Sequence, residues 1–571
     1  MSLRNRFVLV FALSSLAALA GCGSGSNKST PPPTGGFTNS NFNGTYVFSF
    51  SGSDFTASSS VSGSSFFSAA GTLSADGKGD LTGTIDLVDP ELGAVLSVSA
   101  VQTGLSASGN YDVTSDGRAT GTLSFKVGSA TVPMGIDFVL TSNSHGLITR
   151  FDTNGTGSGT LDAQTSGITQ SGLQGSFAFG LSGTDGSGNP LGTVGTFTLD
   201  PNGNVTTGLQ DFNDNGNSSN LANLSFLSPS TVTVAATPGT AQLTTSVTAF
   251  GANGTLSFDV WPIDTSHLKF IETDGAEFLS GDAFSSTGQS FPAGTLVFTM
   301  SGLDISSPPN PFAAGGVLTS DGSSTISGGL EDINDAGAVG QAPSINGGIA
   351  SAGGRTVLTL NGIYNGGWGG TSPTEAGNYA FAAYPYTYNG AVGVELLEID
   401  GAGGITGGTA YLQSSTSIAA SQGYGLNLSG ENTNGEVDLI AEFTTTSTGA
   451  TGLYDANNSG LLISDYNLGT GATYSTGSNG RGTFAFPNLQ TNNTNSVIGA
   501  LNLTYYTVDS STAIFIDTDT STTAGNPQVA VGTFQLQNSS SADLKAAALP
   551  HFSMLGAGKA GAKRQANKLK K

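Results

Sequence analysis

The stretch Gly44-Thr-Tyr-Val-Phe-Ser-Phe-Ser-Gly52 decides the fold, because it has the pattern of a β-strand with one buried face and it recurs along the chain. Its aromatic residues Tyr46, Phe48 and Phe50 alternate with smaller ones, and residues two positions apart lie on the same side of a strand. Related stretches that also run into a Ser-Gly pair begin at Gly175, Gly294 and Gly423.

Other patterns repeat with the same period of about 120 residues, which indicates tandem domains and not short solenoid units. A turn of the form Asp-x-Asn-x-x-Gly occupies 211–216, 332–337 and 455–460, and the first copy has the variant Asp86-Leu-Val-Asp89. A Gly-Arg pair starts a later strand at Arg118, Arg355 and Arg481.

These repeats predict the domain organisation. We expect a signal peptide, a lipidated tether, four β modules and a basic disordered tail, in this order: 1–21, 22–42, 43–167, 168–288, 289–417, 418–540 and 541–571.

Each module contains eight or nine candidate strands joined mostly by turns of hairpin length. An antiparallel meander of this size closes well into a small up-and-down barrel of the lipocalin type, which leaves no exposed edges. We therefore predict an all-β chain of four such barrels. Immunoglobulin-like sandwiches are the alternative, although Trp261 and Trp368 have no cysteine partners for the usual sandwich core.

The N-terminus carries an export signal. Arg4 and Arg6 precede an uncharged apolar run that is too short to span a bilayer and that ends in Leu19-Ala-Gly-Cys22. This tetrad resembles the lipobox of bacterial lipoproteins. The resemblance implies cleavage before Cys22 and acylation of its thiol. Because Gly23 stands where members retained at the inner membrane usually carry Asp, it also implies the outer membrane or cell surface. The modules are similar to repeat domains in uncharacterised lipoproteins of environmental bacteria, which implies no activity.

Charge is distributed unevenly along the chain. The formal net charge is −23, yet seven of the 17 basic residues follow residue 540. The acidic body between 43 and 540 would repel nucleic acid, so we expect no nucleic-acid partner and membrane contact through the N-terminal lipid. The basic tail is expected to be solvated, with binding to an anionic surface as the alternative.

The turn at 211–216 matches the first half of a calcium loop, with Asp211, Asn213 and Asn215 as weak candidate ligands. Ala222 at the twelfth position cannot ligate, and Asp and Asn also favour turns for local reasons. We therefore expect no metal or other cofactor, with calcium as the alternative, and we expect the repeated turn acids to be solvated.

No catalytic constellation can be assembled. The three histidines are His145, His267 and His551. The first two occupy equivalent turns where the fourth module has Thr512, which predicts exposed turn residues. Tyr384, Tyr386 and Tyr388 suit either sugar stacking or strand packing.

The leading functional hypothesis is a non-enzymatic, surface-anchored repeat lipoprotein that acts as a spacer, an adhesin or an envelope component. The alternative is binding of a glycan or a small apolar ligand by the barrels. An envelope hydrolase is the least supported hypothesis, although a catalytic pair of carboxylates could be present among the 40 acidic residues.

Overall fold

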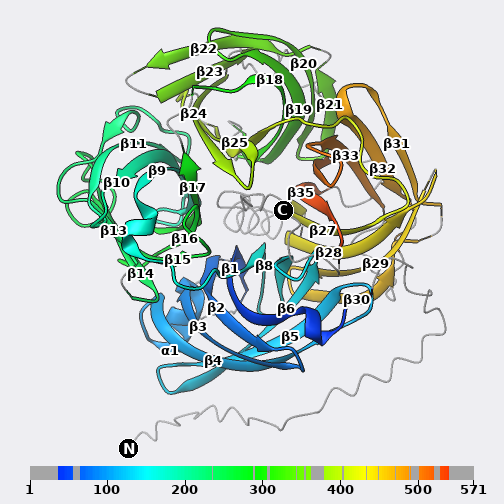
Figure 1. Ribbon diagram of the computed structural model, residues 1–571, viewed down its shortest axis with the longest axis horizontal. Coiled ribbons are helices and arrows are strands. Elements are labelled where there is room, and N and C mark those ends of the chain that lie inside the picture. Colours follow the sequence, from blue (N-terminus) through cyan, green and yellow to red (C-terminus); the bar gives the residue numbers. More distant parts are fainter. Residues whose placement is uncertain are drawn as a thin grey trace, which may run out of the picture. The chain divides into compact units, whose positions relative to one another are not determined.

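The computed structural model (Figure 1) describes residues 36–55, 65–234, 236–286, 290–304, 309–342, 344–352, 355–361, 379–401, 404–432, 434–447, 449–469, 471–487, 489, 500–519 and 528–538. The signal peptide, Cys22, Trp368, His551 and the basic tail lie outside these residues. The described residues all belong to one compact unit.

Barrel 1 is a closed barrel in which each strand pairs with its neighbour in sequence and the last pairs with the first. One short helix, α1 (Pro90–Leu96), lies between its third and fourth strands. The strands are β1 (Asn43–Asp54), β2 (Ser65–Asp76), β3 (Asp80–Val88), β4 (Val101–Val113), β5 (Arg118–Val127), β6 (Ala130–Leu140), β7 (His145–Asp152) and β8 (Gly155–Ala163).

Barrel 3 closes through eight strands, because β19 pairs with both β18 and β20. Its strands are β18 (Ala293–Leu303), β19 (Pro311–Asp321), β20 (Thr325–Asp335), β21 (Ala338–Ala342), β22 (Asn346–Ala352), β23 (Arg355–Asn361), β24 (Tyr379–Tyr388), β25 (Ala391–Glu398) and β26 (Ile405–Leu412).

Barrels 2 and 4 are open sheets, nine-stranded over their described residues, whose edges meet only at single bridges between Asn204 and Thr231 and between Gly449 and Thr473. In barrel 2 the edge strands are too short for a full ladder: β12 (Leu224–Ser225) and β13 (Thr231–Thr233). The remaining strands are β9 (Gly175–Thr184), β10 (Pro190–Leu199), β11 (Val205–Asp214), β14 (Gly239–Thr244), β15 (Thr255–Pro262), β16 (His267–Glu272) and β17 (Phe278–Ser286). Those of barrel 4 are β27 (Gly423–Asn432), β28 (Gly435–Thr445), β29 (Ala450–Asn458), β30 (Leu461–Asn467), β31 (Thr473–Thr476), β32 (Arg481–Phe486), β33 (Leu501–Thr507), β34 (Thr512–Asp517) and β35 (Val529–Leu536).

The cores confirm the prediction of antiparallel barrels, and the sandwich alternative is wrong. Tyr46, Phe48 and Phe50 are buried inside barrel 1, as their alternation predicts. Each of the other barrels likewise has a single cluster of buried aromatic and aliphatic side chains on its inward face.

The outward faces are also buried where barrels meet. Val47 points away from the core of barrel 1 and packs with Trp261 and Ile271 of barrel 2. Contacts also join barrels 2 and 3, 3 and 4, and 4 and 1, so that the contacts close a ring (Figure 1). Repeated copies that are joined head to tail form a ring only when the rotations from one copy to the next add up to a full turn.

Three short 3₁₀ helices complete the described elements: Asn39–Asn41, Gln170–Leu173 and Ser478–Gly480. Among the described residues, no helix combines the length and the apolar character needed to cross a bilayer.

Candidate functional site

The repeated Asp-x-Asn-x-x-Gly turn holds one barrel to the next. In each copy the Asn Oδ1 accepts the N–H of the motif's glycine at 2.9 Å, which fixes the side chain. The Asn Nδ2 then donates to backbone carbonyls of the following barrel. Asn213 donates to Glu398 and Gly404 of barrel 3, and Asn334 donates to Asp517 and Gln528 of barrel 4.

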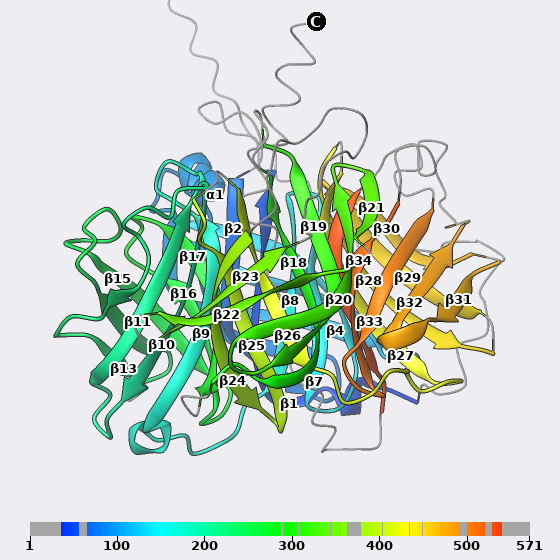
Figure 2. The same ribbon diagram turned by 90° about the horizontal axis from the view of Figure 1, so that it is seen from above.

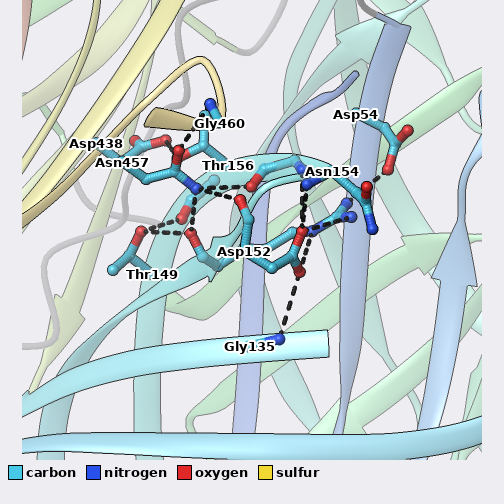
Figure 3. Close-up of polar contacts among 12 residues, drawn as sticks. Asp54, Gly135, Thr149, Asp152, Asn154, Thr156, Asp438, Asn457 and Gly460 are labelled. Atoms are coloured by element: carbon cyan, nitrogen blue, oxygen red, sulfur yellow. Dashed lines mark hydrogen bonds and ion pairs between the residues drawn. The ribbon is translucent and has the colours of Figure 1, made fainter. Parts of the chain in front are cut away.

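The third copy joins barrel 4 back to barrel 1 (Figure 3). Asn457 Nδ2 lies 3.3 Å from the carbonyl oxygen of Arg150, 2.9 Å from that of Asp152 and 2.7 Å from that of Gly155. Nearby, Thr156 Oγ1 of barrel 1 donates to Asp438 of barrel 4 at 2.7 Å. The asparagine thus satisfies three carbonyls in the hairpin between β7 and β8.

The aspartate of the same motif faces the repeated arginine of the next barrel. Asp332 accepts from Arg481 Nε and Nη2 at 2.7 and 2.8 Å and from the Tyr506 hydroxyl at 2.6 Å. The other two copies make related pairs, which are Asp211 with Arg355 and Tyr384, and Asp455 with Arg118. Two motifs that appear separate in the sequence are therefore the two halves of one interface.

The interface between barrels 1 and 2 is a variant. Asp86 accepts from Trp261 Nε1 at 2.8 Å where the other copies use arginine. Val88 takes the place of the asparagine and packs against Trp261, Ile263 and Ile271. This contact is mainly apolar, and within the described residues the last hairpin of barrel 2 receives no asparagine from barrel 1.

The expectation that the repeated turn acids are solvated is wrong for this motif. Asp211, Asp332 and Asp455 are all buried, because the turn packs against another barrel. The same packing determines what the candidate calcium ligands contact. Asp211 and Asn213 have protein partners in barrel 3, and Asn215 is an exposed turn residue with a φ of 50°.

The expectation that His145 and His267 are exposed is also wrong. They are 3% and 1% exposed. His145 Nδ1 lies 2.7 Å from Asp162, and His267 Nε2 lies 2.6 Å from Asp282. Thr512, the residue at this turn in barrel 4, is buried as well, so a threonine there was no evidence of exposure.

Lys269 connects these pairs across barrels 1 and 2. Its Nζ lies 3.1 Å from Asp282, 2.8 Å from Thr160 Oγ1 and 3.9 Å from Asp162. Burial opposes ionisation of Asp282, but Lys269 and His267 lower its pKa to about 2. The cluster is enclosed and its charges are paired. It is therefore better suited to holding two barrels together than to contacting a substrate.

The three tyrosines of β24 pack at the ring interface. Tyr384, Tyr386 and Tyr388 are 3%, 3% and 5% exposed, so the strand-packing alternative is correct and they are not a sugar platform. They share one face of the strand, as period two predicts, and that face lies against barrel 2, where Tyr386 stacks on Phe284.

A cavity lies among barrels 1, 3 and 4 and is lined by residues of β8, β18, β26, β27 and β35. Figure 2 shows the strands of the barrels from above. The volume of the cavity is only about 40 Å³, and it is partly open to solvent. Glycines let the strands approach here, since a Cβ on Gly408 would lie 2.1 Å from the carbonyl oxygen of Thr299. Polar lining residues include Thr160, Thr299, Ser301, Thr409, Asn427 and Thr533.

Each barrel has a polar end, which we call its mouth, at the hairpin between its last two strands. In barrel 1 the mouth holds a buried arginine. Arg150 Nη1 lies 2.9 Å from Asp54, and its Nε lies 3.1 Å from Asp152. The guanidinium also lies 4.4 Å from the ring centre of Phe67. Asp89 is close enough for its charge to act on Arg150.

The mouth of barrel 2 holds carboxylates that could bind a metal ion. Oxygens of Glu272, Asp274 and Glu277 all lie within 4.8 Å of one another. Burial, followed by the charges of Asp274 and Glu277, raises the pKa of Glu272 well above its ordinary value. Burial also raises the pKa of Glu277 to about 7. The sequence signal for this group is the Glu-Thr-Asp run at 272–274, which resembles the Asp-Thr-Asp run at 517–519 of barrel 4.

Comparison with known proteins gives only distant likeness. No protein family model matches the chain, and no curated protein matches it. Among solved structures it is similar to transferrin binding protein B of Haemophilus parasuis Hp5, at 9% identity over 69% of this chain and 83% of that chain, with a TM-score of 0.20. It is also similar to intact Ap-TbpB, at 10% identity over 68% and 81%, with a TM-score of 0.18. A third is a putative AttH from Nitrosomonas europaea, at 11% identity over 68% and 98%, with a TM-score of 0.15.

Proposed function

We propose that this chain is a lipid-anchored, non-enzymatic protein of the bacterial cell envelope that presents a closed ring of four β-barrels at the outer membrane or cell surface. The observation that carries this proposal is the pairing of the repeated polar motifs with one another. The Asp-x-Asn turns and the Gly-Arg pairs bind across barrels, so the repetition builds an assembly and not four separate sites.

The ring favours an envelope component or an adhesin over a spacer. Barrel 4 contacts barrel 1 through Asn457 and through Gln537, whose Nε2 donates to the carbonyls of Asp116 and Leu140. From barrel 1 to barrel 4 the chain therefore returns on itself and does not form an extended row of barrels. The N-terminal resemblance supplies the anchor, with Cys22 as the acylated residue.

The anchor is tested by metabolic labelling with a clickable palmitate analogue. The wild-type chain should incorporate label and fractionate with membranes. Cys22→Ser should lose the label and leave the membrane fraction, while Ser24→Ala should behave as wild type. Label that persists in Cys22→Ser would contradict the anchor. External protease then tests exposure at the cell surface.

A second candidate function is binding of a small polar ligand in the cavity among barrels 1, 3 and 4. The filled barrel cores give no support to a ligand inside a barrel, whereas the small cavity is partly open to solvent and presents hydroxyl groups to which one sugar hydroxyl could bind. Thr299→Tyr would fill this cavity. A glycan array probed with wild type and this variant tests the idea, and binding that Thr299→Tyr leaves unchanged would place the ligand elsewhere.

A further inference from the structure

The mouths of barrels 1 and 2 are built from matching residues. Ser51-Gly-Ser-Asp54 corresponds to Ser182-Gly-Thr-Asp185, and Asp86-x-x-Asp89 corresponds to Asp211-x-x-Asp214. Five residues after each buried histidine, barrel 1 has Arg150 and barrel 2 has Glu272. Two residues further on, each barrel has an aspartate, which is Asp152 in barrel 1 and Asp274 in barrel 2. The repeat thus keeps its acids and reverses the charge of one residue.

Glu272 points into the mouth, where the amide of Leu279 acts on its carboxylate without a hydrogen bond of normal geometry. It follows Leu268 and Phe270 on the inward side of β16, since those residues belong to the core. It is 0% exposed, and neither carboxylate oxygen makes a hydrogen bond of normal geometry. A buried carboxylate left in this state costs several kcal/mol unless a proton or a cation compensates it.

The surrounding residues add negative charge. Glu277 is 5% exposed and accepts from the amide of Gly251 at 2.8 Å. Asp185 and Asp214 lie near enough for their charges to act on Glu277. Five carboxyl groups therefore meet at this mouth, and Asp274 is exposed and gives a path from solvent.

Among the residues that the structure describes, no basic side chain reaches this mouth. Between 43 and 540 there are seven basic residues. Five of them pair with acids elsewhere, namely Arg118, Arg150, Lys269, Arg355 and Arg481. The other two, Lys78 and Lys126, are exposed on barrel 1. The described part of the chain therefore supplies no counter-charge for Glu272.

We propose that the mouth of barrel 2 binds a calcium ion through Glu272, Asp274 and Glu277, with the ion in the place that the guanidinium of Arg150 fills in barrel 1. Hard carboxylate oxygens suit calcium and magnesium. Oxygens on opposite sides of Ca²⁺ lie about 5 Å apart, so carboxylate oxygens that all lie within 4.8 Å of one another can share one such ion. Calcium is favoured over magnesium because it accepts flexible, all-protein carboxylate geometry, whereas Mg²⁺ demands a near-ideal octahedron and keeps several waters.

The test is thermal unfolding of the detergent-solubilised full chain after EDTA treatment, with calcium chloride as the only added ligand. Calcium at about 1 mM should raise the Tm by about 3 °C or more, and EDTA should reverse the rise. Magnesium at the same concentration should raise it by less than half as much. No response to calcium would overturn the site, and an equal response to magnesium would overturn the choice of calcium.

Two variants locate the ion. Glu272→Arg copies the arrangement of barrel 1, so it should abolish the calcium response and unfold in EDTA no earlier than wild type. Asp274→Asn changes an exposed ligand that folding does not require, and it should weaken the calcium midpoint about tenfold or more. Asp200→Asn, at an exposed turn of the same barrel, is the matched control and should keep the full response. A wild-type response in Asp274→Asn would overturn the proposal even if Glu272→Arg failed to fold.

Discussion

Barrels 1 and 2 place acids at the same end, but barrel 1 also carries a cation there. Arg150 pairs with Asp54 and Asp152, whereas Glu272 in the corresponding position adds a further carboxylate. The neighbours differ as well, since Asn457 docks on the hairpin of barrel 1 and the apolar Val88 belongs to the contact with barrel 2. Where these two repeats differ in sequence, the difference therefore falls at a position that contacts a neighbouring barrel or that needs a counter-charge.

Removing the internal cation should have the largest effect. Arg150→Met keeps much of the side-chain volume but leaves the buried Asp54 and its neighbours without a counter-charge. Breaking such a pair from one side costs about 4 kcal/mol. Urea unfolding followed by the fluorescence of Trp261 measures this loss, in a Trp368→Phe background that leaves one indole. Lys78→Met in the same barrel is the control and should stay within about 0.5 kcal/mol of the background. An equal loss in both variants would contradict the comparison.

Loss of the docked asparagine should have the second-largest effect on stability. Asn457→Ala removes the donor for three carbonyls in the hairpin of barrel 1 and leaves them buried without that partner. We expect a loss of about 3 kcal/mol in the free energy of unfolding. Amide hydrogen exchange at Gly155 and Thr156 locates the effect, because these residues lie under the docked side chain. Asn215→Ala, which removes an exposed turn side chain, provides the comparison and should leave exchange there unchanged.

The barrels themselves were predictable because their causes are local. Alternation at Tyr46, Phe48 and Phe50 fixes which face is buried, and frequent turns fix hairpins, so period and turn chemistry were sufficient. That barrels 2 and 4 are open was not predictable, because closure depends on the length of the edge strands, such as β12 and β13 in barrel 2. Those strands are too short to show a period of their own.

The contacts between barrels were beyond the sequence for a different reason. Asp455 and Arg118 are 337 positions apart, and each motif alone reads as an ordinary turn or strand start. The alternation of Tyr384, Tyr386 and Tyr388 shows that they share a face but not that another barrel covers it. A single sequence contains no signal for which outward faces meet.

The buried acid Asp86 at the interface between barrels 1 and 2 should make the free energy of unfolding depend on pH more strongly than an exposed acid does. Burial, opposed by the Gly104 amide and assisted by the charge of Asp259, raises the pKa of Asp86 to about 7. The folded state therefore keeps this proton at pH values where the unfolded chain has lost it. Its contribution to stability is complete below about pH 4 and is lost as the pH rises to about 7, with a slope of at most about 1.4 kcal/mol per pH unit. Asp86→Asn should flatten this part of the pH profile of unfolding, and an unchanged slope would assign it to other groups.

The smallest effect should come from Asp200→Asn, which separates burial from net charge. It removes one carboxyl group from the chain, as Asp86→Asn does, but from an exposed turn. The aspartate accepts from the amides of Asn202 and Asn204 there, and asparagine keeps an acceptor for them. Its unfolding midpoint should match wild type from pH 5 to 8. If both substitutions changed stability equally, overall repulsion in a chain of charge −23 would be the cause. A change confined to Asp86→Asn would show that the position of an acid in the ring decides its effect.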